Sequence, residues 1–127
     1  MKTMLVTGGA GFIGSHLSEG LLARGYQVRV LDSLIYGKRE WVPAAAEFIE
    51  GDIRDPAACR RAAVGMDGVF HCAAMSRSGP SQDQIDVCTQ SNITGTQNML
   101  LAPRSAMDQI AEAVRKVQAH AAELAKG

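Results

Sequence analysis

Near its start the chain reads Val6-Thr7-Gly8-Gly9-Ala10-Gly11-Phe12-Ile13-Gly14, and this stretch is the most informative part of the sequence. It follows the apolar run Met4-Leu5-Val6, which is typical of a buried strand. It leads into apolar residues at helical spacing, which are Phe12, Ile13, Leu17, Leu21 and Leu22. A glycine-rich turn between a strand and a helix is a setting in which backbone N–H groups and the helix start bind phosphate. We therefore expect a phosphate-binding turn here.

The glycines fit two registers at once. Gly9, Gly11 and Gly14 match G-x-G-x-x-G, whereas Gly8, Gly11 and Gly14 match T-G-x-x-G-x-x-G. In either register the first glycine permits the tight turn and the middle glycine lets the backbone approach a pyrophosphate. Gly14 lets the helix lie close to the strand. The sequence leaves both registers open.

An acidic residue follows at the position where a dinucleotide ribose is held. Residues 27–31 predict a second strand that ends at Asp32, and an acidic residue about 20 positions beyond the glycines accepts the ribose 2′-hydroxyl in such folds. Its charge repels a 2′-phosphate, which favours NAD over NADP. The competing interpretation is a buried glycine turn followed by a surface aspartate.

The remaining pattern alternates strands and helices. We expect strands over residues 2–7, 27–31, 47–50 and 68–74, and helices over residues 12–24, 56–63 and 83–101. Asp55 and Pro56 suit a helix cap and first turn, and the last helix has a possible break near residues 89–92. This alternation predicts an α/β fold with parallel βαβ units.

Composition excludes several classes of protein. A chain of 127 residues is one domain, its formal net charge is zero, and no basic stripe or long apolar run points to nucleic acid or a membrane. Cys59, Cys72 and Cys88 lack C-x-x-C spacing, which indicates reduced thiols in a cytoplasmic protein. The three separated histidines do not suggest a metal site: we expect His16 beneath the glycine turn, His71 in the core and His120 exposed to solvent.

Five segments together resemble the N-terminal half of the extended short-chain dehydrogenase/reductases, and within them the NAD-dependent nucleotide-sugar epimerases and dehydratases. The segments are TGGAGFIGSHL (7–17), VLDS (30–33), GDIRD (51–55), VFHCAA (69–74) and NITGTQNML (92–100). They follow the order and spacing of that family over about the first 100 residues. The resemblance implies a truncated three-layer Rossmann-like fold with NAD as cofactor and a parallel sheet in the order 3-2-1-4.

The same resemblance implies roles for single residues. Gly8, Gly11, Phe12, Ile13 and Gly14 would cradle the pyrophosphate. Asp32, with Ser33 beside it, would take the adenosine ribose, and Asp52 and Ile53 would flank the adenine. Ala73, Ala74 and Met75 would line the cofactor along the fourth strand, with Asn92 behind that strand.

The resemblance does not extend to the family's catalytic segment. Family members carry a Tyr-x-x-x-Lys pair, but Val30 and Glu40 stand four residues after Tyr26 and Tyr36. Residues 103–127 instead predict an amphipathic helical tail, over about 105–125, that packs on the domain of residues 1–102 or on a partner. Whether the chain is an enzyme is therefore left open, and we name no catalytic residue.

Three functions are consistent with these features. The first is an NAD(H)-binding Rossmann domain that is not catalytic alone. The second is a half-enzyme that completes a sugar-nucleotide epimerase or dehydratase with another chain, and the third is a minimal or engineered scaffold with a vestigial site. The fourth strand would be a sheet edge, so we also expect a homodimer through this edge or through helices 83–101 and 105–125. Ser76, Ser78 and Ser81 are expected to be polar loop residues.

Overall fold

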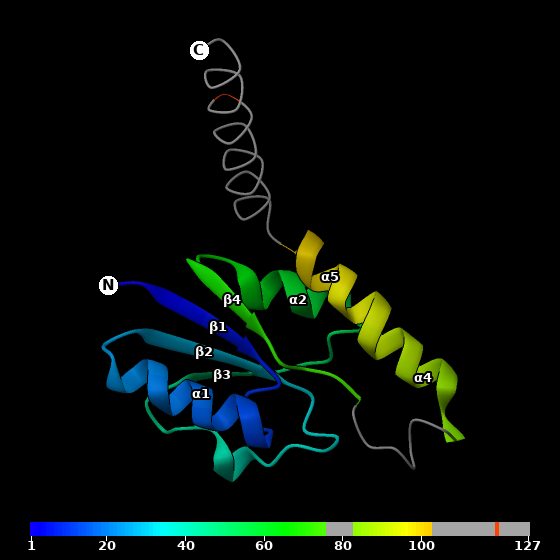
Figure 1. Cartoon of the computed structure of the whole chain (residues 1–127), viewed down its shortest axis with the longest axis horizontal. Helices are drawn as coiled ribbons and strands as arrows, with labels where there is room; N and C mark the ends of the chain where they lie inside the picture. The colour runs from blue at the N-terminus through cyan, green and yellow to red at the C-terminus, as the bar shows by residue number, and fades with distance from the viewer. Residues whose placement is uncertain (76–82, 103–118, 120–127) are drawn as a thin grey trace.

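The computed structural model describes residues 1–75, 83–102 and 119. The predicted helical tail, the loop serines and His120 lie outside the described residues. The described part forms a four-stranded parallel sheet in the order β3-β2-β1-β4, which confirms the predicted order (Figure 1). The strands are β1 (Thr3–Thr7), β2 (Gln27–Asp32), β3 (Glu47–Glu50) and β4 (Gly68–His71).

Helices lie on both faces of this sheet, because neighbouring side chains of one strand point to opposite faces. Val6 and Val30 pack with Leu21 of α1 (Phe12–Ala23), whereas Leu5 and Leu31 pack against the opposite layer. That layer contains α2 (Pro56–Ala63) and α5 (Gly95–Leu101), which contribute Ala62 and Met99. The result is the expected three-layer arrangement, with α1 on one side and α2 with α5 on the other (Figure 1).

Local sequence signals account for the element ends. Asp55 caps α2, since its Oδ1 accepts a hydrogen bond from the Ala57 N–H at 2.9 Å, and Pro56 occupies the first turn as predicted. Gly25 follows α1 with a φ of 82°, the left-handed conformation in which a glycine ends a helix. A short 3₁₀ helix, η1 (Arg39–Trp41), lies in the connection between β2 and β3.

Two predicted elements differ from those observed. The fourth strand ends at His71 and not at Ala74, because its partner β1 ends at Thr7, opposite His71. The predicted helix 83–101 is divided into α4 (Ile85–Thr89), the π-helical segment η2 (Gln90–Thr94) and α5. The expected break is therefore a widened turn inside one continuous helical run, which is a common feature of functional sites.

Candidate functional site

A cleft of about 650 Å³ opens where all four strands end. Ligands of parallel α/β sheets bind in this position, outside the carboxyl ends of the strands. The predicted site residues that line it are Gly8, Gly11, Phe12, Ile13, Gly14, Asp32, Ser33, Asp52, Ile53, Ala73, Ala74 and Met75. Asn92 does not line the cleft and lies one position beyond Ser91, which does.

The structure decides between the two glycine registers. Gly8 has a φ of 70° and lies so close to the segment after β4 that an added Cβ would come within 2.7 Å of the Ala73 nitrogen. Gly9 is buried, and its added Cβ would meet a Val30 methyl group at 2.5 Å. The register that faces the cleft is therefore Gly8, Gly11 and Gly14, whereas Gly9 serves the packing of α1 against the sheet.

The first turn of α1 faces the cleft without a side-chain cap. Gly11 is the N-cap residue, and as a glycine it offers no hydroxyl or carboxylate to the first N–H groups. Phe12 and Ile13 are 73% and 71% exposed, so the start of the helix is open to a ligand. Uncapped N–H groups and the partial positive charge of the helix start suit a phosphate.

Asp32 joins two loops at the rim of the cleft. Its Oδ2 accepts from the Ala10 N–H at 3.0 Å, and its Oδ1 accepts from the Leu34 N–H at 2.8 Å. Leu34 has a φ of 61°, an unfavourable value for a leucine, and this turn places its N–H within reach of the carboxylate. The two bonds fix the carboxylate at the end of β2, where the sequence placed a ribose contact.

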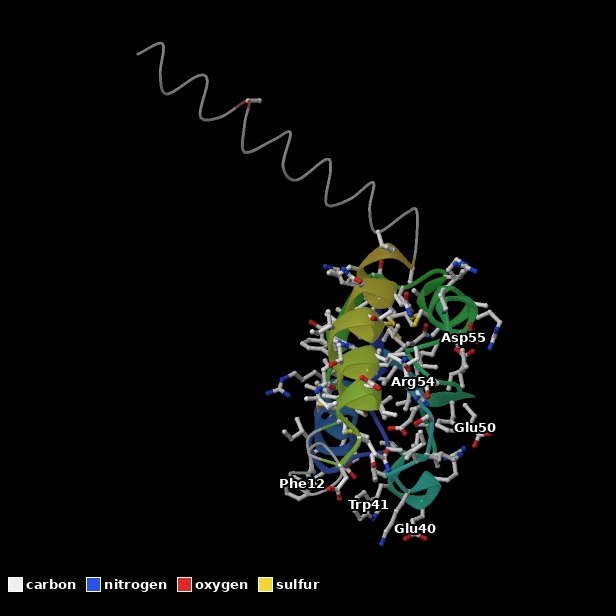
Figure 2. The ribbon with its side chains drawn as sticks, turned by 90° about the vertical axis from the view of Figure 1, so that its right-hand side faces the viewer. Phe12, Glu40, Trp41, Glu50, Arg54 and Asp55 are labelled. Atoms are coloured by element: carbon white, nitrogen blue, oxygen red, sulfur yellow. The ribbon has the colours of Figure 1, made fainter. Side chains whose placement is uncertain are left out.

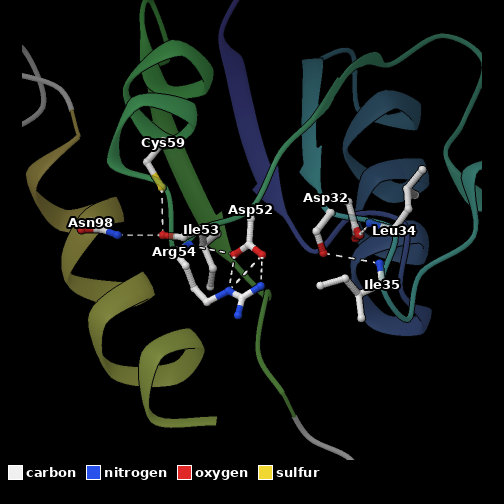
Figure 3. A network of polar contacts seen from close by, with 9 residues as sticks. Asp32, Leu34, Ile35, Asp52, Ile53, Arg54, Cys59 and Asn98 are labelled. Carbon is white, nitrogen blue, oxygen red and sulfur yellow. Dashed lines mark hydrogen bonds and ion pairs between the residues drawn. The ribbon is translucent and has the colours of Figure 1, made fainter. Parts of the chain in front are cut away.

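Asp52 is paired with a residue that the sequence analysis did not select. The Arg54 guanidinium donates from Nε and Nη2 to the carboxylate at 2.7–3.1 Å, and the Arg54 backbone N–H donates to Oδ1 at 2.8 Å (Figure 3). The side-chain hydrogen bond of Arg54 is the main reason that the pKa of Asp52 is lowered. The pair places a negative and a positive charge side by side in the lining of the cleft.

Ile53 connects the cleft to the hydrophobic core. Its side chain is 6% exposed and packs closely against Gly95 of α5. Its carbonyl oxygen accepts from the Asn98 side chain at 2.9 Å and from the Cys59 thiol at 3.3 Å (Figure 3). These contacts fix Ile53 between the lining of the cleft and the core.

The segment after β4 forms another wall of the cleft. Asn92 holds it, since the Asn92 side-chain oxygen accepts from the Met75 N–H at 2.7 Å and its amide nitrogen donates to the Met75 carbonyl at 3.0 Å. His71, expected in the core, is half-buried, and its ring nitrogens lie within hydrogen-bonding distance of the Thr7 and Thr96 hydroxyls. Asn92 thus holds the wall of the cleft through Met75 without lining the cleft itself.

The rim of the cleft contains residues that the sequence analysis did not select. Ile35, Tyr36 and Gly37 line it together with Lys38 and Trp41. Trp41 is 41% exposed, and the Lys38 ammonium lies 5.0 Å from the centre of its ring. Phe12 and Trp41 lie at the same end of the molecule (Figure 2). The glycine at position 37, which follows Ile35 and Tyr36, is the one sequence signal for this rim.

The cysteines are free thiols with different surroundings. Cys59 is buried, and desolvation raises its pKa to about 11. Cys72 is half-buried and lines the cleft, and burial raises its pKa as well. Over residues 1–75 and 83–102, no cluster of three or more metal-ligating side chains is present. No helix in the described part of the chain is long and apolar enough to cross a membrane.

The sheet, the glycine turn and the cleft define a Rossmann-like α/β protein, and comparison with known proteins places it more closely. Residues 4–124 match the sequence profile of the NAD dependent epimerase/dehydratase family. The chain belongs to this family.

The chain is similar to several UDP-glucose 4-epimerases. It is 43% identical to the enzyme of Streptomyces lividans, over 80% of this chain and 32% of that protein. The structure of the Thermus thermophilus UDP-glucose 4-epimerase in complex with NAD aligns with a TM-score of 0.74 and 44% identity, over 79% of this chain and 33% of that one. The Brucella ovis UDP-glucose 4-epimerase in complex with NAD aligns with a TM-score of 0.74 and 36% identity, over 80% and 32%.

The chain spans about a third of the length of these three proteins. It resembles the NAD-binding N-terminal portion of enzymes of the UDP-glucose 4-epimerase type. Its 127 residues contain no Tyr-x-x-x-Lys sequence.

Proposed function

We propose that this chain binds NAD in the cleft at the ends of its strands. The main support for the proposal is that four separate segments line one cleft of about 650 Å³. These segments are the glycine turn, the end of β2, the segment after β3 and the segment after β4. This volume suits a ligand of cofactor size. Structures to which the chain is similar are described as complexes with NAD.

The proposed contacts follow the chemistry of the lining. The pyrophosphate lies over the uncapped start of α1, on Gly8, Gly11, Phe12, Ile13 and Gly14. The adenosine ribose lies against Asp32 and Ser33, and the adenine against Asp52 and Ile53. Ala73, Ala74 and Met75 form the wall along which the rest of the dinucleotide extends, with Asn92 supporting that wall from behind.

A substitution of Gly11 tests the proposal, because a side chain at this position would block the ligand while leaving the fold intact. An added Cβ at Gly11 meets one neighbour, the Gly8 carbonyl oxygen at 3.2 Å, whereas a Cβ at Gly14 would overlap that same oxygen. Gly11→Val therefore fills the space of the pyrophosphate at a small cost in stability. NAD titration by calorimetry should give binding for the unaltered chain and none for Gly11→Val, while urea unfolding shows that both are folded. Equal affinities would contradict the proposal.

A second proposal concerns catalysis by a complete site. The chain matches a third of the length of its epimerase relatives and contains no Tyr-x-x-x-Lys pair, so a positioned acid/base must come from another segment or chain. We propose that the NAD-binding half contributes to sugar-nucleotide epimerisation only when that segment is supplied. Mixing the chain with a polypeptide that carries the C-terminal part of a relative should produce NAD-dependent turnover of UDP-glucose. A stable complex without turnover would contradict this proposal.

We also propose that two copies of the chain associate and that the protein works in the cytoplasm. Val69 and Phe70 on β4 are 40% and 39% exposed, and β4 has no second neighbour within the described part of the chain. An unpaired strand edge next to exposed apolar side chains favours pairing with another copy. The three free thiols are in keeping with a reducing compartment.

A further inference from the structure

His71 links three elements that meet behind the cleft. Its Nδ1 lies 2.6 Å from the Thr7 hydroxyl at the end of β1, and its Nε2 lies 3.0 Å from the Thr96 hydroxyl on α5. His71 itself is the last residue of β4. Both ring nitrogens are therefore engaged, each by a different neighbouring element.

The neighbouring bonds determine where the ring proton resides. The Thr7 oxygen accepts from the Ala73 N–H at 3.2 Å, and Thr7 is completely buried, so its own hydrogen needs an acceptor and finds it in Nδ1. The Thr96 hydroxyl donates to the Asn92 carbonyl at 2.7 Å, so its oxygen is left to accept from Nε2–H. These directions are mutually consistent only for a neutral His71 that carries its proton on Nε2.

The bonded chain continues into the wall of the cleft. From Thr96 it passes to Asn92, whose side chain bonds both the N–H and the carbonyl of Met75. At its other end it reaches the Ala73 N–H through Thr7. The wall of residues 73–75 is thus held at both ends by one network with His71 at its centre.

Among the described residues, the elements whose side chains hydrogen-bond to His71, β1 (TMLVT) and α5 (GTQNMLL), contain no acidic or basic residue, and neither does the adjoining η2 (QSNIT). The other titratable groups along the network are thiols: Cys72 follows His71 in sequence, and Cys88 lies 3.4 Å from the Asn92 amide nitrogen. Burial accordingly lowers the pKa of His71. A proton on Nδ1 would also leave the buried Thr7 hydroxyl without an acceptor.

We propose that His71 is a positioning residue of the NAD site. Its neutral form, with the proton on Nε2, links β1 to α5 and keeps the wall of residues 73–75 in place. Protonation of the ring breaks this link. The inference rests on the proposed function, because it concerns affinity at the same cleft. It assigns a task in ligand binding to a side chain that does not line the cleft.

One measurement tests the network without any ligand. Long-range ¹H–¹⁵N NMR spectra distinguish the two neutral tautomers of histidine, and His71 is expected to give the Nε2–H pattern at about pH 7.5. The ring should stay neutral to a lower pH than in the urea-unfolded chain, and the Met75 amide signal should shift together with its titration. An Nδ1–H pattern, or a Met75 signal indifferent to the His71 titration, would overturn the proposal.

The second measurement is NAD affinity at about pH 7.5 and about pH 5.5, a range in which imidazole titrates and the NAD pyrophosphate keeps its charge. The unaltered chain should bind NAD more weakly at the lower pH. His71→Gln, which keeps a donor toward Thr96 and cannot gain a proton, should bind at similar strength at both values. His71→Phe keeps the ring shape without either bond and should bind roughly tenfold more weakly at both.

A matched control separates this network from histidine titration in general. His16→Gln removes an exposed imidazole on α1 and should keep the pH dependence of the unaltered chain. If His71→Gln retains that dependence too, or if His71→Phe binds as the unaltered chain does, the proposal is wrong. If no form binds NAD, the proposed function fails, and the NMR experiment still decides whether His71 positions the wall.

Discussion

Asp32 fixes two loops with the same carboxylate that would meet the ribose in the proposed NAD complex. Each of its oxygens already accepts one backbone N–H, from Ala10 and from Leu34, and each keeps lone-pair capacity for a ribose hydroxyl. The side chain therefore does not need to reorganise to meet a ligand. A charged acceptor that is fixed in advance discriminates strongly against a phosphate on the ribose.

Replacing this carboxylate should change the preference between cofactors. Asp32→Ala is expected to weaken NAD binding about tenfold and NADP binding less, because the ribose acceptor is lost in both cases but a repulsive charge is lost only for NADP. Calorimetric titration of both dinucleotides measures the ratio. Asp32→Asn keeps the shape and one of the two loop hydrogen bonds, and it separates the loss of the charge from the loss of the whole side chain. Equal losses for NAD and NADP in Asp32→Ala would mean that Asp32 does not contact the ribose.

The Asp52–Arg54 pair should stabilise the fold in a pH-dependent way. A double-mutant cycle with Asp52→Asn and Arg54→Met is expected to give a coupling free energy of about 1 kcal/mol for unfolding at neutral pH. The pair is bidentate, which strengthens it, but partly exposed to solvent, which weakens it. Arg54 lowers the pKa of folded Asp52 below its ordinary 3.8. The contribution is therefore complete above that value and is lost as the pH falls through the lower folded pKa. Urea unfolding at neutral and acidic pH measures it, and a coupling that persists after Asp52 is protonated would contradict the assignment.

At the scale of whole elements, α5 is placed by its closest contact with the segment after β3. Gly95 at the start of α5 has a helical backbone, so its lack of a side chain serves packing and not an unusual conformation. A Cβ there would lie 2.6 Å from the Ile53 Cδ1 atom. This contact brings η2, and with it Asn92, up to the cleft wall.

Two glycine-to-alanine substitutions should therefore have opposite effects. Gly95→Ala is expected to cost roughly 1–3 kcal/mol through overpacking against Ile53. Gly20→Ala, in α1, adds a Cβ whose nearest neighbour is the flexible Arg24 side chain at 3.4 Å, and should stabilise the chain by about 0.5–1 kcal/mol. Urea unfolding followed by circular dichroism measures both values. A change of the same sign in both variants would show that the Ile53 contact does not limit α5.

The elements also show what could be predicted from the sequence. The glycine turn, Asp32 and the Asp55 cap were predictable because backbone conformation and hydrogen-bonding capacity restrict those positions to few residue types. The choice between Gly8 and Gly9 was not, because it depends on which of them faces the segment after β4. The pairing of Arg54 with Asp52 and the rim around Trp41 could not be predicted either. Both depend on the directions of side chains in loops, and loops have no sequence periodicity. The end of the fourth strand at His71 follows from the length of its partner β1, a long-range property.

At the scale of the whole molecule, a second group of exposed apolar side chains, apart from those that line the cleft, lies on elements that follow β3 in sequence. Ile85, Ile93, Leu100 and Leu101 on α4, η2 and α5 are 59–69% exposed, and Val69 and Phe70 are exposed on the edge strand β4. Large exposed apolar side chains in such numbers are typical of surfaces that contact another polypeptide. The described part of the chain thus has exposed apolar side chains both at the cleft and on β4, α4, η2 and α5.

Self-association through the β4 edge can be tested without reference to NAD. The mass from light scattering should rise with concentration from that of the monomer toward that of a dimer, because β4 pairs with β1 alone among the strands of the described residues. Val69→Lys places a charge on this strand and should keep the chain monomeric, since lysine on an edge strand opposes pairing. Val64→Lys is the matched control, because Val64 is 66% exposed at the end of α2 and outside the strand. A monomeric mass for the unaltered chain at every concentration would exclude the dimer, and equal effects of the two substitutions would place the contact away from β4.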